Sequence, residues 1–540
     1  MEKPLDGQQA LDSSNSSTPS ISSPLPEPTT KLESLRARTR PLAFAVICGS
    51  LTLDSFNVTG LTYGQLNIAE HYDVIVTTAS WSLSAYSLAF GSLLLIAGRA
   101  GDMYGHKQVY SYGLIFFSVF ALLAASIDSN FVALCIFRAL QGASAACTVP
   151  TAYAMVGIRY KGQAREMAVA GLGVSSTTGA IMGSINANQT FEVGGAFANT
   201  GLGYRGTLWL SFGISIVLCA LAFLLLEPTP RDPSIEKKPL DVIGSFLVTA
   251  ACAILVYGFT EAPTGWDQAK VIAPIIIGVA LLVSFFIFEQ FVVWKFMPKV
   301  DPLIPTRVWK YSNLVPLTIQ TGLIYGCFFL SVLNGSTFLL RVQERKPLIS
   351  AVMWSPLIIG TLIFCILMGP FYNHRYMPPK WFLVFGSLVL ATGVSLFSRN
   401  NLETGYWRYT FSGSIVMSLG TAIFFVHYLN VAYAATPPED QGLVSGIIQT
   451  SAQVATALGL AIGSSFLSSE TPKGLLPEYR NSFYVAIAFG CAGAIVALVW
   501  IKPIAPRPSN SKKADVEMLQ SGVESPSLHT GSASNTGPEN

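Results

Sequence analysis

Charged residues are scarce in this sequence. Asp, Glu, Lys and Arg make up 12% of the 540 residues, whereas hydrophobic residues make up 51%. Ordinary soluble domains carry about a quarter charged residues. The net charge of +3 is too small and too scattered for a nucleic-acid-binding surface, and no basic run alternates with aromatic residues. We therefore expect a chain embedded in a lipid bilayer, with no nucleic acid among its partners.

The sequence also lacks the short motifs of enzymes and cofactor-binding proteins. It has no glycine-rich phosphate loop, no His-Glu metal pattern and no nucleophile elbow. The eight cysteines fall inside apolar stretches, without the close pairing that is typical of metal sites. We therefore predict that the chain is not an enzyme and has no cofactor and no metal site.

Long apolar runs dominate the remaining sequence. A hydrocarbon core of about 30 Å requires about 20 residues per helix. Fourteen such runs can be found, at 42–63, 77–97, 108–126, 131–153, 166–188, 205–226, 241–260, 271–292, 313–339, 350–369, 381–398, 408–431, 442–467 and 482–502. The short alternating segments of a membrane β-barrel are missing. The predicted fold class is therefore an all-α polytopic membrane protein with fourteen transmembrane helices.

The loops divide these helices into a 6+2+6 arrangement. We expect six-helix bundles over 42–226 and 311–502 and a two-helix insertion with its flanking loops over 227–310. Residues 1–41 and 503–540 are low in apolar residues and are predicted to be disordered tails. Lys and Arg favour the loops on the side of both tails, which places both termini in the cytoplasm. Repeated six-helix halves are a common plan of transporters.

Few ionisable side chains lie within the apolar runs, and each is a functional candidate because burial in a bilayer is costly. Asp54 and Asn57 lie about one helical turn apart in the first run, and Arg138 lies in the fourth. The alternative to a role in proton coupling is a static buried ion pair of Asp54 with Arg138, or a separate hydrogen-bonded core around each residue. His427 is either a hydrogen-bonded structural residue or a contact for substrate or proton. Glu289, near the end of a run, is interpreted as an interfacial residue.

Two motifs resemble those of a known family. The segment "GRAGDMYGHK" at 98–107 is similar to a loop between the second and third spans of the major facilitator superfamily, with Gly98, Asp102, Gly105 and Lys107 in matching positions. The fourth run matches a second family pattern at Leu134, Arg138, Gln141, Gly142, Ala145 and Ala146. Arg138 and Gln141 are three residues apart and so share a helix face.

The chain most resembles the fourteen-span drug:proton antiporters of fungi and bacteria within that superfamily. The resemblance implies that Arg138 takes part in proton coupling. It also implies that the 98–107 loop locks and releases the two halves against the helix that starts near 437–446.

The antiporter motif of the fifth span is matched less well. Gly162, Gly171 and Gly179 align with it, but Ser175 and Ser176 replace a Gly and a Pro. Small residues at these positions still permit close helix packing.

The sequence thus predicts a proton-coupled secondary transporter that moves small organic compounds, cationic or amphipathic, by alternating access. Multidrug or toxin efflux is the leading interpretation. The alternatives are transport of a basic amino acid, ammonium or borate, and a non-transporting nutrient sensor on the same scaffold. We expect a monomer in the plasma membrane, with the vacuolar membrane as the alternative site.

Overall fold

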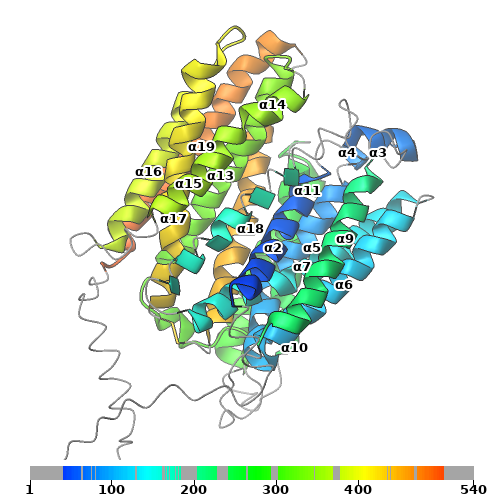
Figure 1. The fold of residues 1–540 in the computed structure, drawn as a ribbon, viewed down its shortest axis with the longest axis vertical. Helices are drawn as coiled ribbons and strands as arrows, with labels where there is room; N and C mark the ends of the chain where they lie inside the picture. Colours follow the sequence, from blue (N-terminus) through cyan, green and yellow to red (C-terminus); the bar gives the residue numbers. More distant parts are fainter. Residues whose placement is uncertain are drawn as a thin grey trace, which may run out of the picture.

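The structure is a computed structural model. It describes residues 40–503 except 62–64, 75, 80, 128–129, 161–163, 166, 170, 177, 180–181, 184–203, 228–240, 263–264, 294–301, 346, 369–377, 435, 438–439 and 468–470. Within these residues every regular element is a helix (Figure 1), in agreement with the predicted fold class. The predicted tails lie outside the described residues, except for short stretches next to the first and last helices.

The N-terminal elements are α2 (Arg40–Thr59), α3 (Gln65–Tyr72), α4 (Val76–Ala79), α5 (Trp81–Tyr104), α6 (His106–Ser126), α7 (Phe131–Arg159) and α9 (Arg205–Leu225). The described residues of 164–183, here called the fifth-span segment, are also helical. The middle of the chain forms α10 (Val242–Glu261), α11 (Ala269–Ile287), the π-helix η3 (Phe288–Val293) and the 3-10 helix η4 (Val308–Lys310).

The C-terminal elements are α13 (Leu314–Arg341), α14 (Pro347–Met353), α15 (Ser355–Met368), α16 (Pro379–Phe397), the π-helix η6 (Trp407–Phe411), α17 (Ser412–Ala434), α18 (Gln441–Ser464) and α19 (Pro472–Trp500).

Twelve helices among the described residues are long and apolar enough to cross a membrane. The fourteen predicted spans are therefore not all present as continuous helices. The span predicted over 166–188 falls partly outside the described residues. The span predicted over 350–369 is divided between α14 and α15 at Trp354. Pro356 lies in the first turn of α15, where its missing N–H costs nothing, but it disfavours a helical residue before it.

The helices form two groups that α18 connects (Figure 1). In one group α7 packs on α5 and α6, and α9 packs on α2 and α6. In the other, α16 packs on α17 and α19, and α13 packs on α18 and α19. Helix α18 also contacts α5 and α7, so it forms the main junction between the two groups. The pair α10 and α11 lies beside this junction, because α10 contacts both α5 and α18.

Glu289 differs from its predicted interfacial position. Its side chain is buried, and its Oε1 accepts a hydrogen bond from the Leu303 backbone N–H at 2.9 Å. Leu303, in the last loop of the insertion, thus lies against the carboxyl group of Glu289 on η3. A return of the chain of this kind leaves no mark in the local hydropathy pattern, which explains the error.

Candidate functional site

Arg138 connects three helices through its guanidinium group. The side chain, on α7, is 0% exposed. Its Nε donates to the Ser82 carbonyl at 3.1 Å, and its Nη2 donates to the Asn57 carbonyl at 2.9 Å. Its Nη1 donates to Gln141 Oε1 at 2.8 Å and to Asn57 Oδ1 at 3.3 Å. We call Asn57, Ser82, Arg138 and Gln141 the polar cluster. This cluster holds α2, α5 and α7 together, and it provides a hydrogen-bond acceptor for each of the three guanidinium nitrogens of Arg138.

Neutral groups surround the charge of Arg138. Within the described part of the chain, no carboxylate lies within ion-pair distance of this guanidinium. The Tyr86 ring lies beneath it, with 4.4 Å between the guanidinium carbon and the ring centroid. A cation over an aromatic face is attracted by the ring quadrupole. The site therefore keeps a buried positive charge that hydrogen bonds and an aromatic ring stabilise, without a matching negative charge.

Asp54 lies on α2 one turn before Asn57 and is 5% exposed. Its Oδ2 accepts a hydrogen bond from the Thr148 hydroxyl of α7 at 2.8 Å. The phenol of Tyr86 lies within electrostatic range of both Asp54 and Arg138. The two predicted charges are thus brought into one region of the N-terminal group, but each has its own partners. The structure does not contain the static ion pair that was one interpretation of the sequence.

His427 lies apart from these residues, in the C-terminal group. It is fully buried on α17, and its Nδ1 interacts with the Ile423 carbonyl at 2.7 Å. Its ring stacks on Phe382 of α16, with ring centroids 4.4 Å apart and an interplanar angle of 9°. These contacts belong to helix packing within one group. They do not bring His427 to Asp54 or Arg138.

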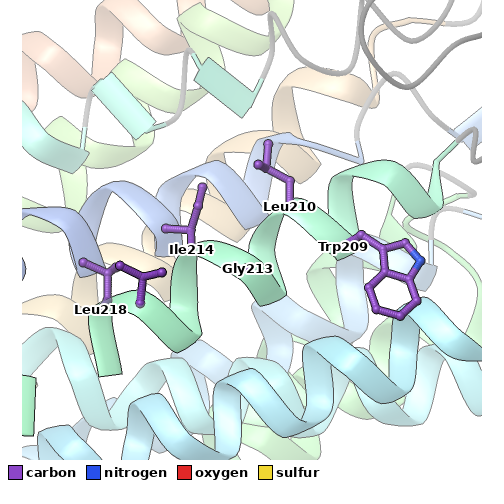
Figure 2. A pocket seen from close by; sticks show the side chains of 6 residues that line it. Trp209, Leu210, Gly213, Ile214 and Leu218 are labelled. Carbon is purple, nitrogen blue, oxygen red and sulfur yellow. The ribbon is translucent and has the colours of Figure 1, made fainter. Parts of the chain in front are cut away.

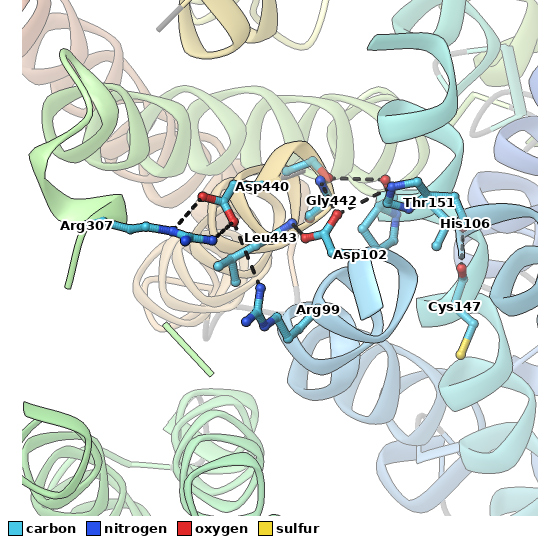
Figure 3. A network of polar contacts seen from close by, with 11 residues as sticks. Arg99, Asp102, His106, Cys147, Thr151, Arg307, Asp440, Gly442 and Leu443 are labelled. Carbon is cyan, nitrogen blue, oxygen red and sulfur yellow. Dashed lines mark hydrogen bonds and ion pairs between the residues drawn. The ribbon is translucent and has the colours of Figure 1, made fainter. Parts of the chain in front are cut away.

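Asp102 joins the end of α5 to the start of α18 (Figure 3). Its carboxylate accepts hydrogen bonds from the Gly442 N–H at 3.1 Å and the Leu443 N–H at 2.7 Å. The N-terminus of a helix carries partial positive charge, which stabilises a carboxylate there. A Cβ added at Gly98 would lie 2.5 Å from the Gly442 carbonyl oxygen, so the two backbones approach as only glycine permits. We call Gly98, Asp102, Gly442 and Leu443 the α5–α18 contact.

A second set of charges lies beside this contact and was missed in the sequence analysis (Figure 3). Asp440 is 0% exposed and precedes α18. Its carboxylate accepts bonds from Arg307 Nη2 at 3.0 Å, Arg307 Nε at 3.2 Å and the Tyr311 hydroxyl at 2.5 Å. Arg99 of α5 lies 3.9 Å away. The position of Asp440 directly before an apolar helix was the available signal, but its partners are more than a hundred residues away.

Gly105 and Lys107 complete the predicted loop, Gly105 between α5 and α6 and Lys107 in the first turn of α6. Gly105 has a φ of 101°, which the turn from α5 into α6 requires and which only glycine adopts readily. Lys107 Nζ donates to the Leu226 carbonyl at 2.5 Å, at the C-terminal end of α9. A cation at a helix C-terminus is favourable. Lys107 therefore stabilises the N-terminal group, whereas His106, whose Nε2 lies 3.4 Å from Asp102 Oδ1, is closer to the junction.

The fifth-span segment packs tightly on α2. The Thr52 hydroxyl donates to the Ser175 carbonyl at 3.0 Å, and a Cβ at Gly179 would collide with the Thr52 carbonyl. A Cβ added at Gly171 would likewise come too close to the ring of Phe44, at 2.9 Å from its Cζ. Ser176 is partly exposed. Gly162 lies outside the described residues. The small residues of the motif thus permit close approach even though the expected Pro is missing.

Three tyrosines connect the two groups away from the α5–α18 contact. The Tyr325 hydroxyl of α13 lies 3.3 Å from that of Tyr428 on α17, and Gln449 Nε2 donates to Tyr428 at 3.5 Å. The hydroxyl of Tyr153, on α7, interacts with Tyr428. Phe425 packs edge-on against Tyr325 at 5.4 Å. We call Tyr153, Tyr325 and Tyr428 the tyrosine cluster. This cluster places aromatic rings and hydroxyls from the N-terminal and C-terminal groups of helices side by side.

Comparison with known proteins identifies the family. The profile described as the Major Facilitator Superfamily matches residues 45–378 and 348–529. The chain belongs to this superfamily. It is therefore an integral membrane protein and a secondary transporter of small molecules, and it is not an enzyme.

Curated relatives have several substrates. The chain is 26% identical over 462 residues to the low affinity ammonium transporter of Saccharomyces cerevisiae, with 83% of this chain and 84% of that protein covered. It is 26% identical to the puromycin resistance protein pur8 of Streptomyces alboniger, with 79% and 84% covered. It is 25% identical to the efflux pump terJ of Aspergillus terreus, with 78% and 79% covered.

Solved structures support the same fold. The human organic anion transporter MFSD10 (TETRAN) matches with a TM-score of 0.60 and 16% identity, over 85% of this chain and 99% of that one. The proton:xylose symporter XylE matches with a TM-score of 0.58 and 10% identity, over 87% of this chain and 97% of that one. At these identities the likeness concerns the fold alone.

One hollow of the transporter's surface lies away from all of these residues (Figure 2). It follows α9 and is lined by Trp209, Leu210, Gly213, Ile214, Val217 and Leu218. These side chains are apolar apart from the indole nitrogen, and the hollow contains none of the predicted site residues. Because Ile214 and Val217 are exposed apolar residues on a helix long enough to span a bilayer, we assign this hollow to the lipid-facing surface.

Proposed function

We propose that this protein is a proton-coupled secondary transporter that moves small cationic or amphipathic organic compounds, with efflux as the direction. The environment of Asp54 carries the proposal. This carboxyl group is buried and has a single hydrogen-bond donor among the contacts described above, the Thr148 hydroxyl. A buried carboxylate without a counter-ion is costly, so the group favours binding a proton or a cation. It cannot bind both, and this competition is the chemistry of antiport.

Arg138 supports the same mechanism. Its guanidinium is held by neutral acceptors and lies in the same region as Asp54, with Tyr86 in electrostatic range of both. When Asp54 loses its proton, the new negative charge appears near a positive charge that has no carboxylate partner among the described residues. We propose that Asn57 and Gln141 position the guanidinium for this purpose, since both accept from its Nη1.

The tyrosine cluster supports an organic substrate with an aromatic or amphipathic part. Tyr325 is partly exposed, as is Phe329, whose ring lies 6.1 Å from that of Tyr325. Aromatic faces bind both apolar surface and organic cations. We propose that they contact the apolar part of the substrate. For His427 we favour the structural role, because its stacking and backbone contact account for its position.

We propose alternating access between the bundles 42–226 and 311–502, with the 227–310 insertion beside them in a fourteen-span, 6+2+6 arrangement. The α5–α18 contact then closes one end of the transporter in the conformation described here. Lys and Arg bias of the loops assigns this end and both termini to the cytoplasm. We further propose a monomer in the plasma membrane.

A second candidate is transport of ammonium or another small cation. The similarity to the low affinity ammonium transporter favours it, and Asp54 suits a small cation as well as a large one. The two candidates differ in whether the substrate contacts the tyrosine cluster, because ammonium has no apolar part for aromatic faces to bind. Replacing Tyr325 by Ala should weaken transport of an aromatic cation and leave ammonium transport nearly unchanged.

The test uses the full-length protein in liposomes with a pH-sensitive dye inside. Organic cations, amino acids, ammonium and weak acids are added one by one, with and without an imposed proton gradient. Proton movement in exchange for an aromatic cation supports the proposal, and proton movement with ammonium alone supports the second candidate. If no compound moves protons, coupled transport is refuted for this panel and a facilitator or nutrient sensor becomes the better account.

A further inference from the structure

Asp440 is shared by two arginines from different parts of the transporter. Arg307 binds it through two nitrogens at 3.0 and 3.2 Å, and Arg99 approaches it at 3.9 Å. Arg99 belongs to α5 and also interacts electrostatically with Asp102, one turn further along that helix. Among the described residues, Asp102 and Asp440 with Arg99 and Arg307 bring two carboxylates and two guanidinium groups together at the junction (Figure 3).

Arg307 is attached to the C-terminal group although it lies in the last loop of the 227–310 insertion. The segment that carries it leads directly into α13. Asn313, at the start of that helix, forms reciprocal hydrogen bonds with Lys502 after α19, at 3.0 Å to its carbonyl and 2.7 Å from its N–H. Val308, one residue after Arg307, is fully buried in the core. These contacts fix Arg307 to the same group of helices as α18 and Asp440.

We infer that Arg307 is the counter-charge that Asp440 keeps when the two groups separate, so that the junction divides into two neutral pairs. Arg99 leaves with Asp102 on α5, and Arg307 stays with Asp440 beside α18. Neither carboxylate is then left without a cation at the moment when the contact between α5 and α18 breaks. The inference rests on the alternating access proposed above, and it makes the last loop of the insertion part of the gating machinery.

The division of charges predicts opposite effects for the two arginines. Without Arg307, Asp440 depends on Arg99 across the junction, so separation costs more and the closed form gains population. Without Arg99, the attraction across the junction weakens while Asp440 keeps its partner, so the closed form loses population. Tyr311 donates to the same carboxylate at 2.5 Å. Loss of its hydroxyl should therefore shift the population toward the closed form, as loss of Arg307 does.

The experiment measures the distance between two spin labels on the full-length protein. The labels are placed at Tyr104 and Ala434, which are exposed at the ends of α5 and α17, after the eight native cysteines are replaced. Arg307→Gln should raise the ratio of closed to open form by about fivefold or more, and Arg99→Gln should lower it by a similar factor. Both variants are also measured with Gly98→Ala, which destabilises the closed form without changing a charge.

Further variants separate charge from folding. Arg307→Lys keeps the charge and should behave like the unmodified protein, and in an Asp440→Asn background Arg307→Gln should have no effect. If Arg307→Gln does not fold, Tyr311→Phe should still shift the ratio toward the closed form.

The inference is overturned if Arg307→Gln raises the population of the open form. It is also overturned if Arg307→Gln leaves the ratio of closed to open form unchanged both with and without Gly98→Ala. Because the labels report conformation without any substrate, opposite shifts would support the inference even if no solute were transported. Coupled transport without those shifts would reject the inference and leave the proposed function intact.

Discussion

Gly98 provides a direct test of the α5–α18 contact. In the Gly98→Ala variant the new methyl group would lie 2.5 Å from the Gly442 carbonyl oxygen and 3.4 Å from the Gly446 Cα. Moving that oxygen to the 3.4 Å of an ordinary contact requires a displacement of about 0.9 Å. Backbone atoms cannot move aside individually as a flexible side chain can, so α18 as a whole must withdraw from α5.

The displacement affects the bonds that Asp102 accepts. The bond to the Leu443 N–H lengthens from 2.7 Å, and the bond to the Gly442 N–H lengthens from 3.1 Å, beyond the range of a hydrogen bond. A hydrogen bond to a charged group contributes about 1.5–3 kcal/mol. Since water replaces part of this in the separated form, we expect the closed form to lose about 2–4 kcal/mol, or about 30- to 700-fold in population.

The assay uses a cysteine at position 445 in a chain without native cysteines. Ser445 is fully buried, and its hydroxyl donates to the Pro150 carbonyl across the junction at 3.2 Å, so a maleimide reaches this position only after the groups separate. Gly98→Ala should raise the rate of labelling by about 30-fold or more. Gly213→Ala is the matched control, because a Cβ at Gly213 meets no atom within 4 Å. Equal labelling rates in the two variants would refute the assignment of this contact as a gate.

Three further substitutions test the other parts of the site. Asp54→Asn should abolish proton exchange in liposomes without reducing expression, because the amide oxygen still accepts the Thr148 bond; normal proton exchange would contradict the coupling role. Lys107→Ala should lower the free energy of unfolding by about 0.5 kcal/mol through the lost contact with the end of α9, measured by thermal denaturation. A changed labelling rate at position 445 would instead place Lys107 in the gate. Gly142→Ala should destabilise the fold by about 1–3 kcal/mol, because a Cβ there collides with the backbone of α5; an unchanged melting temperature would show that α5 and α7 can separate at no cost.

The features that could be predicted from the sequence are those determined by residues close together in the chain. Apolar run length predicted an all-α membrane protein, although twelve of the described helices, and not fourteen, are long and apolar enough to span a membrane. The spacing of Arg138 and Gln141 placed them on one face, where they are hydrogen-bonded at 2.8 Å. The loop motif drew attention to Asp102, which accepts from the Gly442 N–H at the start of α18, and its role as a gate stays a prediction. The loop also predicted Lys107 as a gating residue. The motif does not determine which way a side chain points from the helix surface, and the side chain of Lys107 extends to α9.

The features that were missed depend on chain segments that meet only after folding. Asp440 and Arg307 are 133 residues apart, and neither belongs to an apolar run in which a charge would attract attention. Glu289 is buried because Leu303 returns over it. Trp354, between α14 and α15, stacks on Phe397 of α16, with centroids 5.2 Å apart. Hydropathy records how apolar a segment is, but not which distant segment covers it.

Helix α7 connects the two levels of the proposed mechanism. It carries Arg138 in the polar cluster, Thr148, which donates to Asp54, and Pro150, whose carbonyl accepts from Ser445 of α18. Thr148 and Pro150 are two residues apart, about 3 Å along the helix axis. A proton on Asp54 removes the charge that strengthens the Thr148 bond, and any resulting shift of α7 acts directly on its contact with α18. The proposed coupling between proton binding and gating therefore needs no long pathway, because α7 contacts both sites within a single turn.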